Sequence, residues 1–161
     1  GIQAQLWGET VRSNAQASDM LFPRLFVLAE RAWHQPEWAE EYRSGISYSA
    51  DTQHIDASQR LAMQTDWVRF SRLLSTKAMP QLIKDGLQPR VPLPGAIIEQ
   101  GTLKMNTPFW GLDLEYKIND KVWLPYKTPL TLSAPSTIKL RARVPGTRVS
   151  SREQTLQFEE Q

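Results

Sequence analysis

Apolar and polar residues alternate over the first positions of the chain. Between Ile2 and Leu6 every second residue is apolar, and the residues between them are glutamines. A period of two predicts a strand with one buried face. Gly8 ends the alternation, and Glu9 follows it directly. The first predicted element is therefore a strand whose end carries an aromatic ring, Trp7, and a carboxylate, Glu9.

The apolar period then lengthens to 3.6 residues. Leu21 to Trp33 place their apolar side chains on one broad face, which predicts a mostly buried helix. Ser18 or Asp19 is expected to cap it, and Pro23 fits if it lies in or close to the first turn.

Charged residues interrupt the apolar face of this helix. An unpaired buried charge costs several kcal/mol, so charges at such positions are normally paired. We therefore expect Glu30 to form an ion pair with Arg24 or Arg31, in a structural role.

A second helical pattern extends from about Ala57 to Lys84. Pro80 is expected to kink or split this helix, and Gly86 is placed to end it. Met63 and Met79 are interpreted as core filling. The apolar stripe consists of Leu61, Trp67, Phe70, Leu74, Ala78 and Leu82.

The composition changes at Gln88, where prolines and then Gly95 form a stiff linker in which no helix continues. Beyond the linker the period returns to two, most clearly over Leu112–Ile118 and Ile138–Val144. Asn119-Asp120 supplies a tight hairpin turn. About six or seven short strands over the last 70 or so residues indicate a small immunoglobulin-like antiparallel β-sandwich.

The composition narrows the functional classes. The chain has 161 residues, of which 40% are hydrophobic, so a real core is expected. The net charge of +2 is far from the dense basic stripe that binds phosphates, so nucleic acid is not implied. The chain has no cysteine for a disulfide or a thiolate metal site, and no apolar run approaches a membrane span.

Few side chains suggest chemistry. Asp51, His54 and Asp56 crowd the loop from Gly45 to Asp56, but they lack convergent partners, so a solvated loop is preferred to a metal site. In the β-module, Trp110, Trp123 and Tyr126 are either core residues or sugar-stacking residues.

A basic stripe marks one predicted strand. Lys139, Arg141 and Arg143 are interpreted as a solvated sheet face, with an anion-binding patch as the alternative.

Six motifs of the chain together carry a resemblance to a known family. The first three are Leu6-Trp7-Gly8-Glu9 with its Gln5 and Thr10-Val11-Arg12 flanks, Phe22-Pro23-Arg24, and Leu28-Ala29-Glu30-Arg31-Ala32-Trp33-His34. The other three are Arg90-Val91-Pro92-Leu93-Pro94-Gly95, Leu114-Glu115-Tyr116 and Trp123-Leu124-Pro125-Tyr126. The first three resemble the last strand and helix of the catalytic barrel of the family 20 β-N-acetylhexosaminidases, and within that family the bacterial chitobiases. The other three resemble the linker into the chitobiase C-terminal domain and the central hairpin of that domain. Together the motifs cover nearly the whole chain in the family's order.

The resemblance implies an α+β chain with two regions. Residues 1–91 would be the C-terminal end of a (β/α)₈ catalytic barrel, with its last strand, its last helix and a long extra helix. Residues 92–161 would be an immunoglobulin-like C-terminal β-sandwich. Without the N-terminal part of the barrel, the first strand is expected to have no native partner on either edge.

The resemblance also implies an activity: removal of non-reducing terminal N-acetylglucosamine from chito-oligosaccharides by a substrate-assisted retaining mechanism. In the family a Glu protonates the glycosidic oxygen, and an Asp orients the 2-acetamido group that attacks the anomeric carbon. That pair lies earlier in the barrel, so no catalytic residue is expected here and the chain alone should be inactive. Trp7 would wall the sugar pocket, and Glu9 would accept hydrogen bonds from distal hydroxyls.

The implied partners are an N-acetylglucosamine-containing oligosaccharide and the N-terminal part of the barrel. No cofactor or metal is implied. The family parallel suggests a periplasmic or exported bacterial enzyme. The alternative function is a carbohydrate-binding or purely structural accessory β-sandwich, in which Trp110, Trp123 and Tyr126 would matter.

Overall fold

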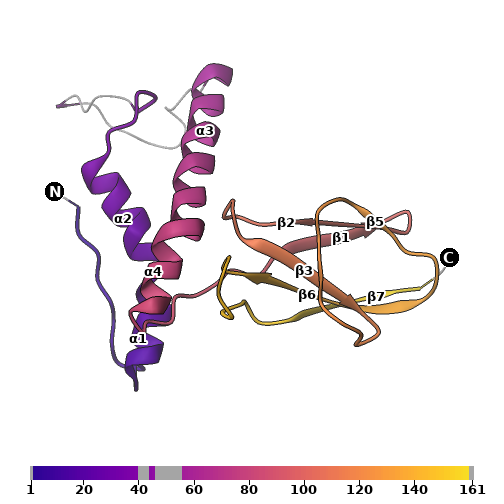
Figure 1. Cartoon of the computed structure of the whole chain (residues 1–161). Coiled ribbons are helices and arrows are strands. Elements are labelled where there is room, and N and C mark those ends of the chain that lie inside the picture. Colours follow the sequence, from indigo (N-terminus) through magenta and orange to yellow (C-terminus); the bar gives the residue numbers. More distant parts are fainter. Residues whose placement is uncertain (1, 40–43, 46–55, 160–161) are drawn as a thin grey trace.

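The chain folds into a helical part followed by a β-sandwich (Figure 1). The structure is a computed structural model and describes residues 2–39, 44–45 and 56–159. The helices are α1 (Asn14–Leu21), α2 (Arg24–Trp33), α3 (Ala57–Leu73), a π-helix (Leu74–Ala78) and α4 (Met79–Lys84). The strands are β1 (Gly95–Glu99), β2 (Thr102–Asn106), β3 (Asp113–Ile118), β4 (Leu124–Pro125), β5 (Leu130–Thr131), β6 (Ser136–Arg143) and β7 (Gln154–Phe158).

The predicted N-terminal strand does not form in this chain. Residues 2–7 pair with none of the described strands. Its apolar side chains are not buried either, because Ile2 is 52% exposed and Trp7 is 74% exposed. A strand needs a neighbour to satisfy its backbone groups and cover one face, and the segment has no such neighbour here. The prediction that this segment forms a strand is therefore not met within the described residues.

The first predicted helix is two helices. Ser13, rather than Ser18 or Asp19, is the N-cap of α1, and its hydroxyl accepts a hydrogen bond from the Gln16 backbone N–H at 3.2 Å. Pro23 lies between α1 and α2 and starts the second one. Proline is tolerated only in the first turn of a helix. A proline that follows the eight residues of α1 therefore divides the apolar pattern between two helices.

The expected burial of this region was wrong. No residue of α2 is buried, and Trp33 is 91% exposed. The expected ion pair of Glu30 with Arg24 or Arg31 is also absent: the Arg24 guanidinium instead donates to the Met20 carbonyl at 2.9 Å. Because Arg24 and Arg31 are exposed and Glu30 is only partly buried, burial does not force these charges to pair.

The second helical pattern forms over its predicted range. Asp56 caps α3 through a capping box with Gln59. The helix is divided next to Pro80, as expected: α3 passes into the π-helix Leu74–Ala78, and α4 then begins with Pro80 in its first turn. A proline ring clashes with the carbonyl four residues back, and a π-turn moves that carbonyl aside. Met79 is fully buried, as predicted.

The sandwich has two antiparallel sheets, with strand orders β1-β2-β5 and β4-β3-β6-β7. Ile138 and Leu140 point inward from β6 and are fully buried with Leu103 of β2. Asn119 and Asp120 both have positive φ, as the predicted hairpin turn requires, and Lys121 donates to the Ile118 carbonyl at 3.1 Å. The predicted sandwich is confirmed.

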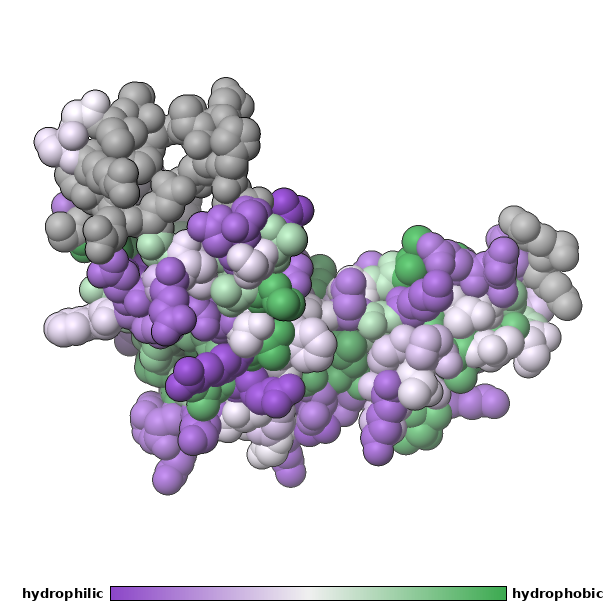
Figure 2. Space-filling model, turned by 90° about the horizontal axis from the view of Figure 1, so that it is seen from above, coloured by the Kyte–Doolittle hydropathy of each residue, from purple (hydrophilic) through white to green (hydrophobic). Residues whose placement is uncertain are grey.

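A second core joins the sandwich to the helices. It consists of the buried residues Leu74, Met79, Val91, Leu112, Ala142 and Val144. The Trp67 indole N–H donates to the Pro108 carbonyl at 2.9 Å, and Ser71 Oγ accepts from the Trp110 backbone N–H at 3.2 Å. Figure 2, seen from above, shows the sandwich projecting from the helical part at this contact.

Candidate functional site

Trp7 and Glu9 lie on an exposed loop that leads into α1. Trp7 is 74% exposed, and Glu9 is also exposed. A turn follows them, because the Val11 backbone N–H donates to the Gly8 carbonyl at 3.1 Å. An indole face can pack on a sugar ring, and a carboxylate can accept hydrogen bonds from its hydroxyls. The loop therefore offers both kinds of group, but it offers no second carboxylate for acid–base chemistry.

Arg12 and Gln16 fasten this loop to α1. The Arg12 guanidinium donates to the Glu9 backbone carbonyl at 2.7 Å. The Arg12 backbone N–H donates in turn to Gln16 Oε1, also at 2.7 Å. The backbone of Glu9 is thus held by α1, while its carboxylate stays exposed.

Three hydrogen-bonded contacts fasten α1 and its C-terminal end to the linker before the sandwich. Ser18 is 4% exposed, and its hydroxyl accepts from the Gln88 backbone N–H at 2.9 Å. Arg90 donates to Asp19 Oδ2 from Nε at 3.0 Å and from a terminal nitrogen at 2.6 Å. The Arg90 backbone N–H also donates to the Phe22 carbonyl at 3.0 Å.

The Asp19–Arg90 ion pair shifts the pKa of Arg90, and both residues line a hollow. Hydrogen bonding to Asp19, together with its charge, raises the pKa of Arg90 above its usual value. The hollow, about 450 Å³, is lined by Thr10, Ala15, Gln16, Asp19, Met20 and Arg90.

The aromatic residues proposed for the sandwich do not join this loop. Figure 1 shows the N-terminal segment on the side of the helices away from the sandwich. Trp110 is 51% exposed, and its backbone N–H is bound to Ser71. Tyr126 is partly buried, and its hydroxyl accepts from the Met105 backbone N–H at 3.0 Å.

Trp123 packs on two cations of the outer sheet face. The Arg141 guanidinium lies 4.1 Å from the ring centroid, and the Lys117 ammonium lies 4.8 Å from it. Such contacts stabilise a ring in one orientation. Trp123 and Tyr126 thus both make contacts within the sandwich, so a structural role accounts for their positions.

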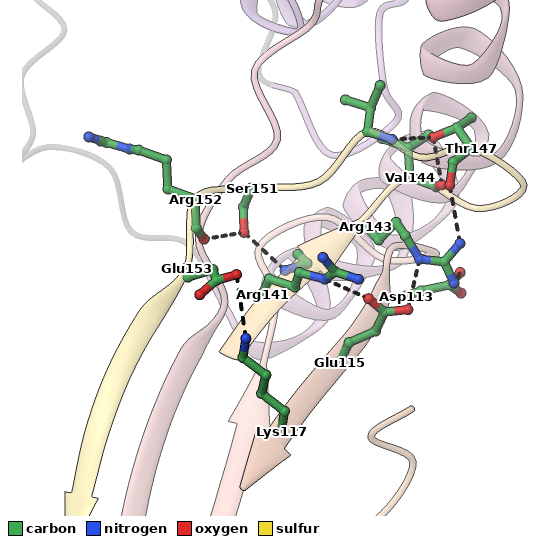
Figure 3. A network of polar contacts seen from close by, with 12 residues as sticks. Asp113, Glu115, Lys117, Arg141, Arg143, Val144, Thr147, Ser151, Arg152 and Glu153 are labelled. Atoms are coloured by element: carbon green, nitrogen blue, oxygen red, sulfur yellow. Dashed lines mark hydrogen bonds and ion pairs between the residues drawn. The ribbon is translucent and has the colours of Figure 1, made fainter. Parts of the chain in front are cut away.

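The basic face of β6 is matched by acidic residues (Figure 3). Glu115 accepts from Arg141 Nε at 2.7 Å and from Arg143 Nε at 2.8 Å. Lys139 donates to Asp120 at 2.7 Å, which lowers the pKa of Asp120. Because carboxylates already neutralise these cations, the face is a paired network rather than an anion-binding patch.

The structure adds no support for a metal site. Asp51 and His54 lie outside the described residues, and Asp56 is the N-cap of α3. Among residues 2–39, 44–45 and 56–159, no three His, Cys, Asp or Glu side chains gather to hold an ion. None of the described helices is long and apolar enough to cross a membrane.

The contacts from α1 to the linker were missed in the sequence. The sequence predicts only that Ser18 or Asp19 caps a helix and that Arg90 belongs to a linker motif. The partners are about 70 residues apart. A periodic pattern describes residues close together in the sequence. It cannot predict a contact between residues this far apart, so the contact is seen only in the fold.

Comparison with known proteins identifies both parts of the chain. Residues 1–36 match the family model for the glycosyl hydrolase family 20 catalytic domain. Residues 78–152 match the model for the chitobiase/beta-hexosaminidase C-terminal domain. The first match includes Trp7 and Glu9, and the second begins at the end of the π-helix.

Several bacterial relatives agree with these matches. The chain is 39% identical over 126 residues to the N,N'-diacetylchitobiase of Vibrio harveyi, covering 78% of this chain and 14% of that protein. It is 37% identical over 131 residues to the beta-hexosaminidase of Vibrio vulnificus, covering 78% of this chain and 16% of that protein. It is 46% identical over 74 residues to beta-hexosaminidase B of Pseudoalteromonas piscicida, covering 46% of this chain and 10% of that protein.

The chain spans about one seventh of the length of these relatives. The two model matches follow the order in which a catalytic domain precedes a C-terminal domain. From the matched residues and these relatives we conclude that the chain belongs to glycosyl hydrolase family 20, as a C-terminal part of a chitobiase/beta-hexosaminidase.

Proposed function

We propose that this chain is the sugar-recognition end and the C-terminal domain of a longer glycosidase, called the parent enzyme below. The parent enzyme removes terminal N-acetylglucosamine from the non-reducing end of chito-oligosaccharides. The substrate's own 2-acetamido group acts as the nucleophile, with an Asp-Glu pair supplied by the rest of the catalytic barrel. This chain contributes binding residues, and alone it is inactive.

One observation carries the proposal: an exposed indole and an exposed carboxylate share one loop inside the segment that matches the catalytic-domain model. Trp7 forms a wall of the pocket for the terminal sugar. Glu9 accepts hydrogen bonds from the distal hydroxyls of that sugar, and its negative charge strengthens these bonds. Neither residue takes part in bond cleavage.

The exposed apolar residues of the helical part support the proposal that the rest of the barrel packs against it in the parent enzyme. Trp33 is 91% exposed, Ile2 52%, and Leu6 and Leu25 40% each. Many exposed large apolar side chains within one part of a chain favour a surface that another part normally covers. In the parent enzyme, the remaining strands and helices of a parallel barrel would pair with residues 2–7 and cover this surface.

The test is the kinetics of the parent enzyme on an aryl N-acetylglucosaminide. Glu9→Gln should lower kcat/KM by about 10- to 100-fold, because a hydrogen bond to a charged group contributes roughly 1.5–3 kcal/mol. The loss should shrink with a substrate that lacks the 4-hydroxyl. Glu37→Gln is the matched control, since Glu37 is also an exposed glutamate.

Two results would contradict the proposal. One is a Glu9→Gln parent enzyme with unchanged kinetics on the intact substrate. The other is hydrolysis by the 161-residue chain alone that survives purification and scales with its concentration.

Carbohydrate binding by the sandwich is the second candidate function. One observation favours it: Trp110 leaves 51% of its surface exposed although its backbone is fixed. Titration of the chain with chito-oligosaccharides, followed by tryptophan fluorescence, tests this function. A saturable response that Trp110→Ala or Trp123→Ala removes would support it, and no response in the wild type would leave both residues with a packing role.

A further inference from the structure

A continuous series of contacts joins the sugar-recognition loop to the sandwich. Its first part is the hold of α1 on the loop, through Arg12 and Gln16. The Arg12 guanidinium donates to the Glu9 carbonyl, and the Arg12 backbone N–H donates to Gln16 Oε1. Each hydrogen bond is 2.7 Å long. The position of α1 therefore constrains the backbone of Glu9 through Arg12.

The second part is the hold of the linker on α1. Gln88 and Arg90 bind Ser18 and Asp19 on consecutive positions of the helix, and Arg90 binds the Phe22 carbonyl through its backbone. Thr10 of the loop and Arg90 of the linker line the same hollow, so loop and linker lie close together.

The third part is the hold of the sandwich on the linker. Val91, next to Arg90, is 8% exposed and belongs to the core that contains Leu112 and Val144. Its burial fixes the linker to the inner end of the sandwich. The linker and residues 148–152 also line one cleft of about 900 Å³.

The Asp19–Arg90 pair is too exposed to be explained as a stabiliser of the whole fold. The side chains of Arg90 and Asp19 are 49% and 42% exposed. Exposed ion pairs contribute little to stability, because water screens them. A guanidinium that donates twice to one carboxylate does, however, fix direction. Its effect is therefore on orientation.

We infer that Asp19 and Arg90 are positioning residues for substrate recognition. They hold α1, and through it the loop with Trp7 and Glu9, in the place that the C-terminal sandwich sets. This inference rests on the proposed function of Glu9. Neither residue contacts the sugar, and each acts through Glu9. The sandwich thereby contributes to substrate affinity without binding substrate itself.

The experiment measures KM, kcat and melting temperature of the parent enzyme carrying Asp19→Asn or Arg90→Gln. Asp19→Asn should raise KM about five-fold and change kcat less than about two-fold, within the range of couplings that positioning residues produce. Arg90→Lys keeps the positive charge but loses one of the two nitrogens that donate to Asp19. The KM of this variant should therefore lie between those of wild type and Arg90→Gln. The melting temperature should stay within about 2 °C of wild type.

The matched control breaks an equivalent pair in the sandwich. Lys104 and Glu99 are 53% and 52% exposed and lie 2.6 Å apart, the same separation as the closest Arg90–Asp19 atoms. Glu99→Gln removes an exposed ion pair with no connection to the loop. It should leave KM unchanged.

A double-mutant cycle with Glu9→Gln tests whether Asp19 acts through Glu9. If it does, Asp19→Asn has no further effect on KM once Glu9 is replaced. Additive losses, or the same KM for Asp19→Asn and wild type, would overturn the inference. Failure of the proposed function looks different, because then Glu9→Gln itself leaves the kinetics unchanged.

Discussion

Ser71 and Ser75 form a matched pair of sites at the contact between the helices and the sandwich. Both side chains are fully buried, and they lie four residues apart. Ser71 Oγ accepts a hydrogen bond from the Trp110 backbone N–H at 3.2 Å. Ser75 Oγ has no hydrogen-bond partner within the described part of the chain. Replacing each serine by alanine removes the same single oxygen, so the cavity costs nearly cancel in the comparison.

The two substitutions should change stability in opposite directions. Ser71→Ala leaves the Trp110 N–H without its acceptor, which costs about 1–2 kcal/mol. Ser75→Ala removes a hydroxyl that was buried without compensation, so it should stabilise the chain by up to about 1 kcal/mol. The free energies of unfolding of the two variants should therefore differ by about 2 kcal/mol, with Ser71→Ala the less stable.

Urea unfolding followed by tryptophan fluorescence measures this difference directly. For a chain of this size, a difference of about 2 kcal/mol corresponds to roughly 4–8 °C in melting temperature. Equal stabilities, or a Ser75→Ala variant less stable than wild type by 1 kcal/mol or more, would refute the reasoning. The latter result would show that Ser75 has a partner in solution.

Three other perturbations are informative. Gly111 has φ +93°, and a methyl group there would lie 3.1 Å from a neighbouring methyl carbon. Gly111→Ala should cost about 1–3 kcal/mol more than Gly146→Ala, which meets only the positive-φ strain, in urea unfolding. Glu115→Gln should cost about 1–3 kcal/mol, because it loses charged hydrogen bonds from two arginines, and equal unfolding midpoints would contradict this. Hydrogen bonds from Lys139 and Lys117 lower the pKa of Asp120 from its usual value. A lowered folded-state pKa stabilises the fold above the unfolded-state pKa, and this contribution disappears as the pH falls through the folded-state pKa. Asp120→Asn should therefore be less stable than wild type near neutral pH and equally stable in strong acid, and a constant difference across that range would argue against the pairing.

The sandwich could be predicted because the alternation of apolar and polar residues in its strands matches their buried and exposed faces. In β6, Ile138, Leu140 and Ala142 are fully buried, and they alternate with Lys139, Arg141 and Arg143. One face meets the core and the other meets solvent and neighbouring carboxylates, so a local period of two suffices to place the strand.

The N-terminal strand was not formed although its pattern is equally regular. Residues 2–7 alternate as well, but the strand that this pattern predicts needs neighbours to pair with. The alternation of apolar and polar residues shows which face of a strand would be buried. It does not show which strand would pair with it. The loop residues Trp7 and Glu9 could be chosen from their motif, whereas their support by Asp19 and Arg90 could not. That support depends on a contact across 71 residues, which no local pattern encodes.

The core shared by helices and strands has a consequence for how such proteins can be cut and recombined. The family model of the C-terminal domain starts at residue 78, and the sandwich region expected from the sequence starts at residue 92. Either cut would remove Leu74 from the cluster that also holds Leu112, Ala142 and Val144. A sandwich released there would carry an uncovered apolar end. The smallest unit that can be exchanged between relatives with its core intact therefore begins at the capping box of α3, well upstream of the first strand.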